Sequence, residues 1–169
     1  MSDLDIRIEA VAARPIAAAR GQATPASLTT TIFELLDQVW PFLRRHKVPT
    51  GHNVVIYHDT VFNIEAGVEV FGPLPATEEP VLASQTPAGR AATTTHWGPY
   101  SELPQVAQAV LQWCAENGYR LAGTSWEVYG DWSDDPSRLR TDVFFLLEAE
   151  ECGRKAALFE GRWGRRAAD

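Results

Sequence analysis

One carboxylate set among aromatic residues is the first feature of this sequence that could do chemistry. Glu127 lies in TSWEVYGDW, residues 124–132, between Trp126 and Val128. β-Branched and aromatic residues favour a strand, and alternate side chains of a strand share a face. Glu127 and Tyr129 should therefore point one way, and Trp126 and Val128 the other. If both faces are covered, an unpaired carboxylate is costly, so Glu127 needs a partner.

The partner of Glu127 has two sources that the residues alone leave open. An internal arginine, such as Arg90 or Arg140, would make Glu127 a structural residue. A molecule from outside the chain would make it a binding or catalytic group.

Other reactive residue types do not form a recognisable site. The four histidines have neither metal-ligand spacing nor an evident carboxylate partner; they are His46, His52, His58 and His96. The two cysteines, Cys114 and Cys152, are isolated. No phosphate-binding loop and no Ser-His or Cys-His nucleophile motif is evident. We therefore expect no metal site and no cofactor, and we expect Cys114 to lie on the apolar side of a helix, in the core of the protein.

Length and composition indicate one globular domain, or two small halves sharing a core. The chain has 169 residues, of which 45% are hydrophobic and 22% charged. No apolar run approaches the roughly 18 residues needed to span a membrane, and the N-terminus lacks the pattern of a signal peptide. We expect a cytoplasmic protein without a membrane partner.

The charge is unevenly distributed. Residues 154–169 form a basic C-terminal tail with a net charge of +3, which leaves −10 for the rest of a chain whose total is −7. Phosphate binding needs Lys and Arg gathered on one face, so we expect no nucleic-acid partner. The acidic body suits cationic ligands, and the tail is expected to be a solvated end.

The predicted elements occur in two rounds with the same order: strand, helix, strand, strand. In the first round they are a strand over 4–19 interrupted at Arg14–Pro15, a helix over 27–46 containing Pro41, and strands over 54–58 and 64–70. A Pro-rich loop follows at 71–80. In the second round they are a strand over 89–97, a helix over 101–116, and strands over 124–130 and 141–148.

The two rounds can be aligned at the central strand. GHNVVIYHD, residues 51–59, matches GTSWEVYGD, residues 123–131, so that Tyr129 corresponds to Tyr57 and Glu127 to Val55. A carboxylate in one half where the other keeps an apolar residue is typical of a site. We predict an α+β fold made of a duplicated β-α-β-β unit, with a curved antiparallel sheet, two helices and a ligand groove between the halves.

Several segments together resemble the GyrI-like small-molecule-binding family, which includes effector-binding domains of multidrug-sensing regulators. They are ARPIAAARG, VVIYHD, PAGRAATTTHWGPYSELPQVAQAVLQWCAENGY, SWEVYGD and TDVFFLL, within about residues 4–148. The resemblance implies one domain over 1–153, with repeats at about 4–70 and 89–148. It also implies a hydrophobic pocket whose central glutamate meets cationic aromatic compounds, and Glu127 matches that position.

Physical chemistry supports such a ligand. Large delocalised cations are weakly hydrated, and each aromatic face adds about 0.5–2 kcal/mol of cation–π attraction. Besides Glu127, the candidate ligand-binding residues are the aromatic walls Tyr57, Tyr129, Trp97, Trp40 and Phe62.

The biological output is open at this stage. Nothing before Leu4 could be the DNA-binding region of the regulators, so a stand-alone binder is expected. Some stand-alone members of the family are hydrolases that open cyclopropane-bearing natural products, which would make Glu127 a general base and Tyr129 or Tyr57 its partner. A protein-interaction module is the third alternative.

The apolar residues on the other face of the central strands also need cover. These residues are Val54, Ile56, Trp126 and Val128. The N-terminal strand, the tail or a second copy in a homodimer could supply it.

Overall fold

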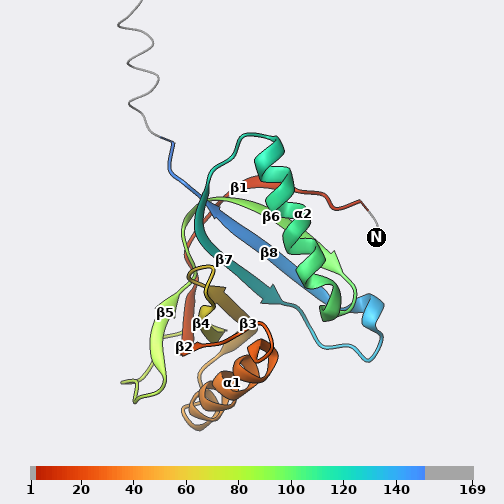
Figure 1. Cartoon of the computed structure of the whole chain (residues 1–169). Coiled ribbons are helices and arrows are strands. Elements are labelled where there is room, and N and C mark those ends of the chain that lie inside the picture. The colour runs from red at the N-terminus through yellow and green to blue at the C-terminus, as the bar shows by residue number, and fades with distance from the viewer. Residues whose placement is uncertain (1–2, 151–169) are drawn as a thin grey trace, which may run out of the picture.

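A computed structural model describes residues 3–150, which form an α+β fold with one eight-stranded antiparallel sheet and two α-helices (Figure 1). The strands are β1 (Arg7–Val11), β2 (Pro15–Gln22), β3 (Thr50–Tyr57), β4 (Asn63–Val70), β5 (Leu82–Gln85), β6 (Gly89–Trp97), β7 (Leu121–Tyr129) and β8 (Arg140–Leu147). The helices are α1 (Leu28–Arg45) and α2 (Leu103–Glu116), with 3-10 turns η1 (Tyr100–Glu102) and η2 (Pro136–Arg138).

The sheet is arranged symmetrically about its central strand pair. Its order is β1-β6-β8-β7-β3-β4-β2-β5, so that β7 and β3 lie in the middle. The elements β2-α1-β3-β4 and β6-α2-β7-β8 follow each other in the same order along the chain. Each group of three strands occupies one half of the sheet.

The edges of the sheet depart from the prediction. The segment 4–19 is not one strand, because β1 pairs with β6 whereas β2 pairs with β4 and β5. The strand is interrupted before Pro15, as expected. β5 was not predicted; it is only four residues long and follows the Pro-rich segment. β1 precedes the first group of elements in the chain but pairs with β6 of the second group. β5 comes directly before the second group but pairs with β2 of the first.

These exchanged strands force the sheet to curl. Residues 12–14 link β1 at one edge to β2 near the other, and residues 86–88 link β5 to β6 in the opposite direction. Such a link reaches at most about 14 Å. The two links also bond to each other: the Arg14 N–H donates to Thr86 Oγ1 and the Thr86 N–H to the Arg14 carbonyl, both at 2.9 Å. Both edges are therefore held together.

On the concave face of the curled sheet, apolar side chains from the two halves pack against each other. One apolar cluster joins residues from both halves: Ile16, Ala18, Val54, Ile56, Ala91, Trp126 and Val128. Trp126 is 3% exposed and stacks on Phe144, with ring centroids 4.9 Å apart. Its predicted position on the face opposite Glu127 is confirmed. This face needs no second copy to cover it.

Both helices pack on the opposite, convex face. α1 buries Leu35, Leu36, Val39, Phe42 and Leu43, and continues past Pro41 to Arg45. α2 buries Val106, Val110 and Cys114, which confirms the core position predicted for this cysteine. Figure 1 shows α1 over one half of the sheet and α2 over the other. Among the described residues, no helix is long and apolar enough to cross a membrane.

A substitution at Gly67 of β4 tests how closely β4 approaches β2. A Cβ atom at this position would lie 2.3 Å from the Ala17 carbonyl oxygen of β2, a backbone atom that cannot turn away. We expect Gly67→Ala to lower the free energy of unfolding by about 2–3 kcal/mol, measured by urea denaturation. Gly72→Ala is the control, because its nearest neighbour would be 3.7 Å away. Equal stability of the two variants would contradict this packing.

Candidate functional site

Glu127 lies at the centre of the sheet, on the face that carries both helices. It pairs with Val55 across β3 and β7, and with Val143 of β8. Val55 packs in the cluster beneath α1, and Val143 packs with Leu103 and Val106 of α2. The carboxylate is therefore at the seam between the helix-covered halves.

The register of β3 and β7 agrees with the sequence alignment of the two halves. Asn53 pairs with Tyr129, Val55 with Glu127, and Tyr57 with Ser125. An approximate twofold relation that exchanges Val55 and Glu127 also exchanges Tyr57 and Tyr129. The two tyrosines flank the carboxylate from opposite sides because of this register.

Both tyrosines donate to the same oxygen of Glu127. The Tyr57 hydroxyl lies 3.3 Å from Oε2, and the Tyr129 hydroxyl also donates to Oε2. One carboxylate oxygen thus receives a hydrogen bond from each half of the domain. The three residues predicted from strand parity and the repeat alignment lie together.

The second oxygen of Glu127, Oε1, has a different environment. It has no hydrogen-bond partner among the described residues, yet it is not one of the fully enclosed unpaired oxygens, which are Glu65 Oε1 and Thr141 Oγ1. Since Glu127 is half-buried, this oxygen touches solvent. It can accept a bond from a molecule that comes from outside.

Neither arginine considered from the sequence pairs with Glu127. Arg90 bonds Glu150 at 2.8 Å, and Arg140 bonds both oxygens of Asp142 at 3.1 and 3.2 Å. Within residues 3–150, Glu127 forms no ion pair with a basic side chain. Its internal partners are the two neutral hydroxyls.

Burial sets the protonation of this cluster. Desolvation raises the pKa of Glu127 above its usual range, although the hydrogen bonds from Tyr129 and Tyr57 act in the opposite direction. Desolvation, followed by the charge of Glu127, raises the pKa of Tyr57 and of Tyr129 well above the ordinary tyrosine value. The tyrosines therefore keep their protons and act as donors.

Further aromatic rings extend outward from the two tyrosines. Phe62 meets Tyr57 edge-on with centroids 6.4 Å apart, and Tyr100 of η1 meets Tyr129 edge-on at 5.4 Å. Trp40 of α1 packs against the same cluster as Tyr57 and Tyr129, and its indole N–H donates to Asn53 Oδ1 at 3.0 Å. Sequence reasoning missed Tyr100, although it ends the GPY turn before α2.

Trp97 does not lie with the other expected wall residues. It pairs with Arg140, whereas His96 pairs with Thr141, which in turn faces Tyr129. Strand alternation therefore places Trp97 on the face opposite Glu127. Trp97 is 59% exposed, and its ring centroid lies 5.9 Å from the Arg140 guanidinium. Trp97 was expected to be a wall of the site because it lies beside the GPY turn. The alternation of side chains along β6 was not used in that prediction.

Trp97 instead lines a separate cavity of about 510 Å³. The cavity is bounded by the N-terminal segment, the end of β6 and η1: Asp3, Leu4, Asp5, Arg7, Thr95, His96, Trp97 and Glu102. It includes neither Glu127 nor the two tyrosines, so it is distinct from the groove expected between the halves.

Three histidines have carboxylate partners that sequence spacing did not reveal. His58 lies 2.5 Å from Glu65, His96 lies 3.3 Å from Glu102, and His52 lies between two carboxylates. The pairs join residues of different elements or bring a strand to the following turn. In the part of the chain from 3 to 150, no group of three or more His, Cys, Asp or Glu side chains is placed to hold a metal ion.

The raised pKa of Glu127 predicts a pH-dependent cost to stability. An acid with a raised pKa favours the fold when it is protonated, and this contribution is lost as pH rises through the folded-state pKa. We expect Glu127→Gln to increase Tm at pH 8, with the difference shrinking towards pH 4. Thermal denaturation at several pH values measures this. A variant less stable than the wild type at pH 8 would show that the charged form is the favoured one.

Comparisons with known proteins show the family and the fold to which this chain belongs. The model of the GyrI-like small molecule binding domain matches residues 4–148. Comparison with the curated proteins gives no match.

Solved structures share the fold at low sequence identity. The EcmrR C-terminal domain is 19% identical, with a TM-score of 0.73 over 86% of this chain and 98% of that one. In the EcmrR complex with DNA, the match spans 57% of the EcmrR chain. The structure of SAV2435 bound to tetraphenylphosphonium is 9% identical, with a TM-score of 0.61 over 86% and 94% of the two chains.

A hydrolase from Listeria innocua is 12% identical, with a TM-score of 0.53 over 85% of this chain and 91% of that one. At these identities the structural matches show a common fold. The family model covers most of the chain, and the chain belongs to the GyrI-like small molecule binding domain family.

Proposed function

We propose that this domain binds hydrophobic aromatic small molecules, often cationic ones, at the seam occupied by Glu127. One observation carries the proposal: Oε2 of the carboxylate is held by a tyrosine from each half, while Oε1 touches solvent and has no partner among the described residues. A half-buried acceptor without an internal counter-ion is suited to an external cation.

The surroundings favour a soft cation over a hard one. Tyr57 and Tyr129 contact the carboxylate, and Phe62 and Tyr100 extend the aromatic surface on either side. A delocalised cation gains cation–π attraction from such rings, at about 0.5–2 kcal/mol each, and loses little hydration. The ligand in the SAV2435 structure, tetraphenylphosphonium, is a cation of this kind.

The tyrosines also fix the position of the negative charge. Their two hydrogen bonds hold Oε2 in place and leave Oε1 without a hydrogen-bond partner among the described residues. Because both tyrosines remain protonated, Glu127 is the member of this cluster that can carry the negative charge. We propose that Trp40, with its indole bonded to Asn53, is a fixed wall on the α1 side.

Hydrolysis is the second candidate, and the raised pKa of Glu127 favours it. A carboxylate of increased basicity can take a proton from water, whose oxygen then bonds to a carbon of a strained ring as a C–C bond breaks. A protonated Tyr57 or Tyr129 could return a proton to the carbon that receives the bonding electrons. The structural relative described as a hydrolase is consistent with this option.

A matched pair of ligands separates charge recognition from apolar binding. Methyltriphenylphosphonium is cationic, and triphenylphosphine oxide is neutral and of similar size. We expect Glu127→Gln to weaken binding of the cation more than tenfold, about 1.4 kcal/mol, and to change the neutral ligand less than twofold. Isothermal titration calorimetry measures both affinities.

Trp97→Ala is the control for this experiment, because Trp97 lies on the other face of the sheet; it should leave both affinities unchanged. Equal losses of both ligands in Glu127→Gln would argue against charge pairing.

The hydrolase alternative needs a different readout. Incubation with a cyclopropane-bearing electrophile, followed by mass spectrometry, reports ring opening as addition of water. We expect any such turnover to disappear in Glu127→Gln and to fall in Tyr129→Phe. Turnover that survives Glu127→Gln would remove this residue from the chemistry.

A further inference from the structure

The outer edge of the sheet is open where β6 ends. β1 pairs with β6 only as far as Arg7 and Thr93, whereas β6 continues to Trp97. Within residues 3–150, the last part of β6 is paired with β8 alone. Residues 94–97 therefore form a strand edge with no strand on their outer side.

The segment before β1 leaves this edge because it packs with residues of α2. Leu4 contacts the cluster of Leu103 and Val106 on the helix-covered face. The Thr94 hydroxyl donates to the Asp5 carbonyl at 3.0 Å. These contacts draw the segment towards the helix-covered face, so its backbone does not continue the pairing that β1 makes with β6.

The backbone groups that face the open side belong to Thr95 and Trp97. The Gly98 N–H donates to the Leu139 carbonyl at 2.9 Å, in line with the register of β6 and β8. Hydrogen-bonded and non-hydrogen-bonded positions alternate along an antiparallel pair. His96 therefore bonds with β8, and its two neighbours turn their N–H and C=O groups outward. Among the described residues, no hydrogen bond reaches these outward groups.

These two residues also line the separate cavity of about 510 Å³. The cavity lies between the end of β6 and the N-terminal segment that has left the edge, so there is space beside Thr95 and Trp97. An exposed strand edge pairs readily with another extended chain. The unpaired backbone groups and the adjoining space together fit an added strand.

Acidic side chains predominate around this cavity. Asp3, Asp5 and Glu102 line it, together with Arg7. The Arg7 guanidinium lies 3.9 Å from Asp5 and 3.4 Å from Glu9, so its charge is already balanced. Complementary charge selects the partner at an interface. The excess of carboxylates therefore favours a segment that carries Lys or Arg.

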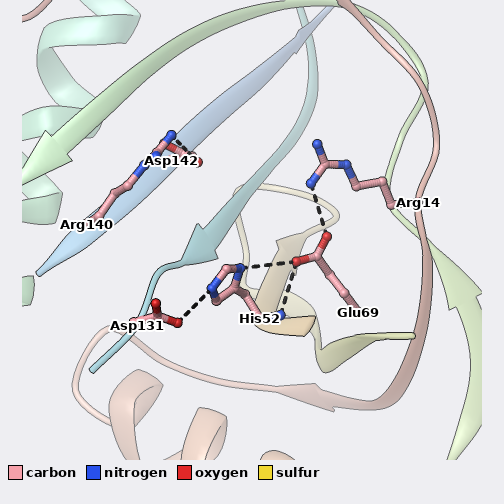
Figure 2. Close-up of polar contacts among 6 residues, drawn as sticks. All are labelled: Arg14, His52, Glu69, Asp131, Arg140 and Asp142. Carbon is pink, nitrogen blue, oxygen red and sulfur yellow. Dashed lines mark hydrogen bonds and ion pairs between the residues drawn. The ribbon is translucent and has the colours of Figure 1, made fainter. Parts of the chain in front are cut away.

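The two faces of this edge differ in character. Trp97 presents an exposed side chain on the concave face. His96 lies on the helix-covered face, with its Nε2 3.3 Å from Glu102 Oε2. The cation nearest the Trp97 ring is Arg140, whose guanidinium is held by Asp142 (Figure 2). An added strand would meet an aromatic surface on one face and carboxylates on the other.

We propose that the edge of β6 at Thr95 and Trp97 pairs with an extended segment of a partner protein in which basic and apolar residues alternate. Backbone hydrogen bonds to the two open residues supply the pairing. The apolar side chains lie against Trp97, and the basic side chains face Asp3 and Glu102. The proposal does not rest on the small-molecule site, because Glu127 does not line this cavity.

NMR spectroscopy of the ¹⁵N-labelled full chain tests the pairing residue by residue. The probe is a capped peptide of sequence TKVKVT. We expect the amide resonances of Thr95 and Trp97 to shift saturably and their exchange with solvent to slow. The amide of His96 already bonds with β8 and should change little.

N-methylated forms of the same peptide provide a matched pair. Residues directly opposite each other in an antiparallel pair share a face, so the valines of the peptide would lie opposite Thr95 and Trp97. N-methylation of the valines removes the donors that face β6 and should abolish binding. N-methylation of the lysines removes donors on the outer side and should leave binding intact. Equal behaviour of the two forms would overturn the backbone pairing.

Charge variants test the basic side chains. Asp3→Asn combined with Glu102→Gln should weaken the peptide about fivefold, as expected for exposed ion pairs. Glu34→Gln is the control, because Glu34 is an exposed carboxylate of α1 on the other half of the sheet. Glu127→Gln should also leave the peptide affinity unchanged, so this proposal and the small-molecule site fail or succeed separately.

Three further results would overturn the proposal. The first is the absence of saturable shifts at millimolar peptide. The second is a set of shifts centred on Tyr57 and Tyr129, which would place the peptide at the Glu127 seam. The third is a shift of the Thr95 and Trp97 amides with protein concentration alone, which would mean that a second copy of the chain occupies this edge.

Discussion

The antiparallel pairing of β3 with β7 is the constraint on which the site depends. It places Val55 opposite Glu127, and so it fixes Tyr57 and Tyr129 at matching distances along the two strands. Both hydroxyls reach one oxygen because of this register. A shift of one residue would turn the carboxylate to the concave face. A single charge at the centre of a nearly symmetric pair can serve a site built from both halves.

The curled sheet explains how such a charge is kept at the seam. Its concave face is closed by apolar side chains, and buried acidic residues on it have basic neighbours: Glu69 lies beside Arg14 and His52, and Glu65 beside Arg20 and His58. Buried carboxylates ordinarily require such partners. Glu127, on the convex face, has hydroxyl donors instead. This contrast within one sheet distinguishes the candidate binding carboxylate from the structural ones.

Much of the site can be predicted from patterns within single segments of the sequence. The features that were missed depend on contacts between residues far apart in the sequence. Strand alternation and the alignment of Tyr57 with Tyr129 were enough to group these tyrosines with Glu127. The exchange of β1 and β5 could not be read from the sequence, because it depends on pairing between residues far apart, such as Ala17 with Ala83. Trp97 was misplaced because its nearness to a turn was used in place of its parity with His96. The carboxylate neighbours of His52 are Glu69 of β4 and Asp131, which follows β7, and no sequence spacing reveals them.

Competition between a proton and a cation for Glu127 provides the most direct measurement. The affinity for methyltriphenylphosphonium would be measured from pH 4 to pH 8, beside that for triphenylphosphine oxide. Our account predicts that the cation is lost as pH falls, beginning at a higher pH than an ordinary carboxylate would give, because burial raises the pKa of Glu127. The neutral ligand should show no such loss. Parallel pH profiles for the two ligands would contradict recognition of the cation by this carboxylate.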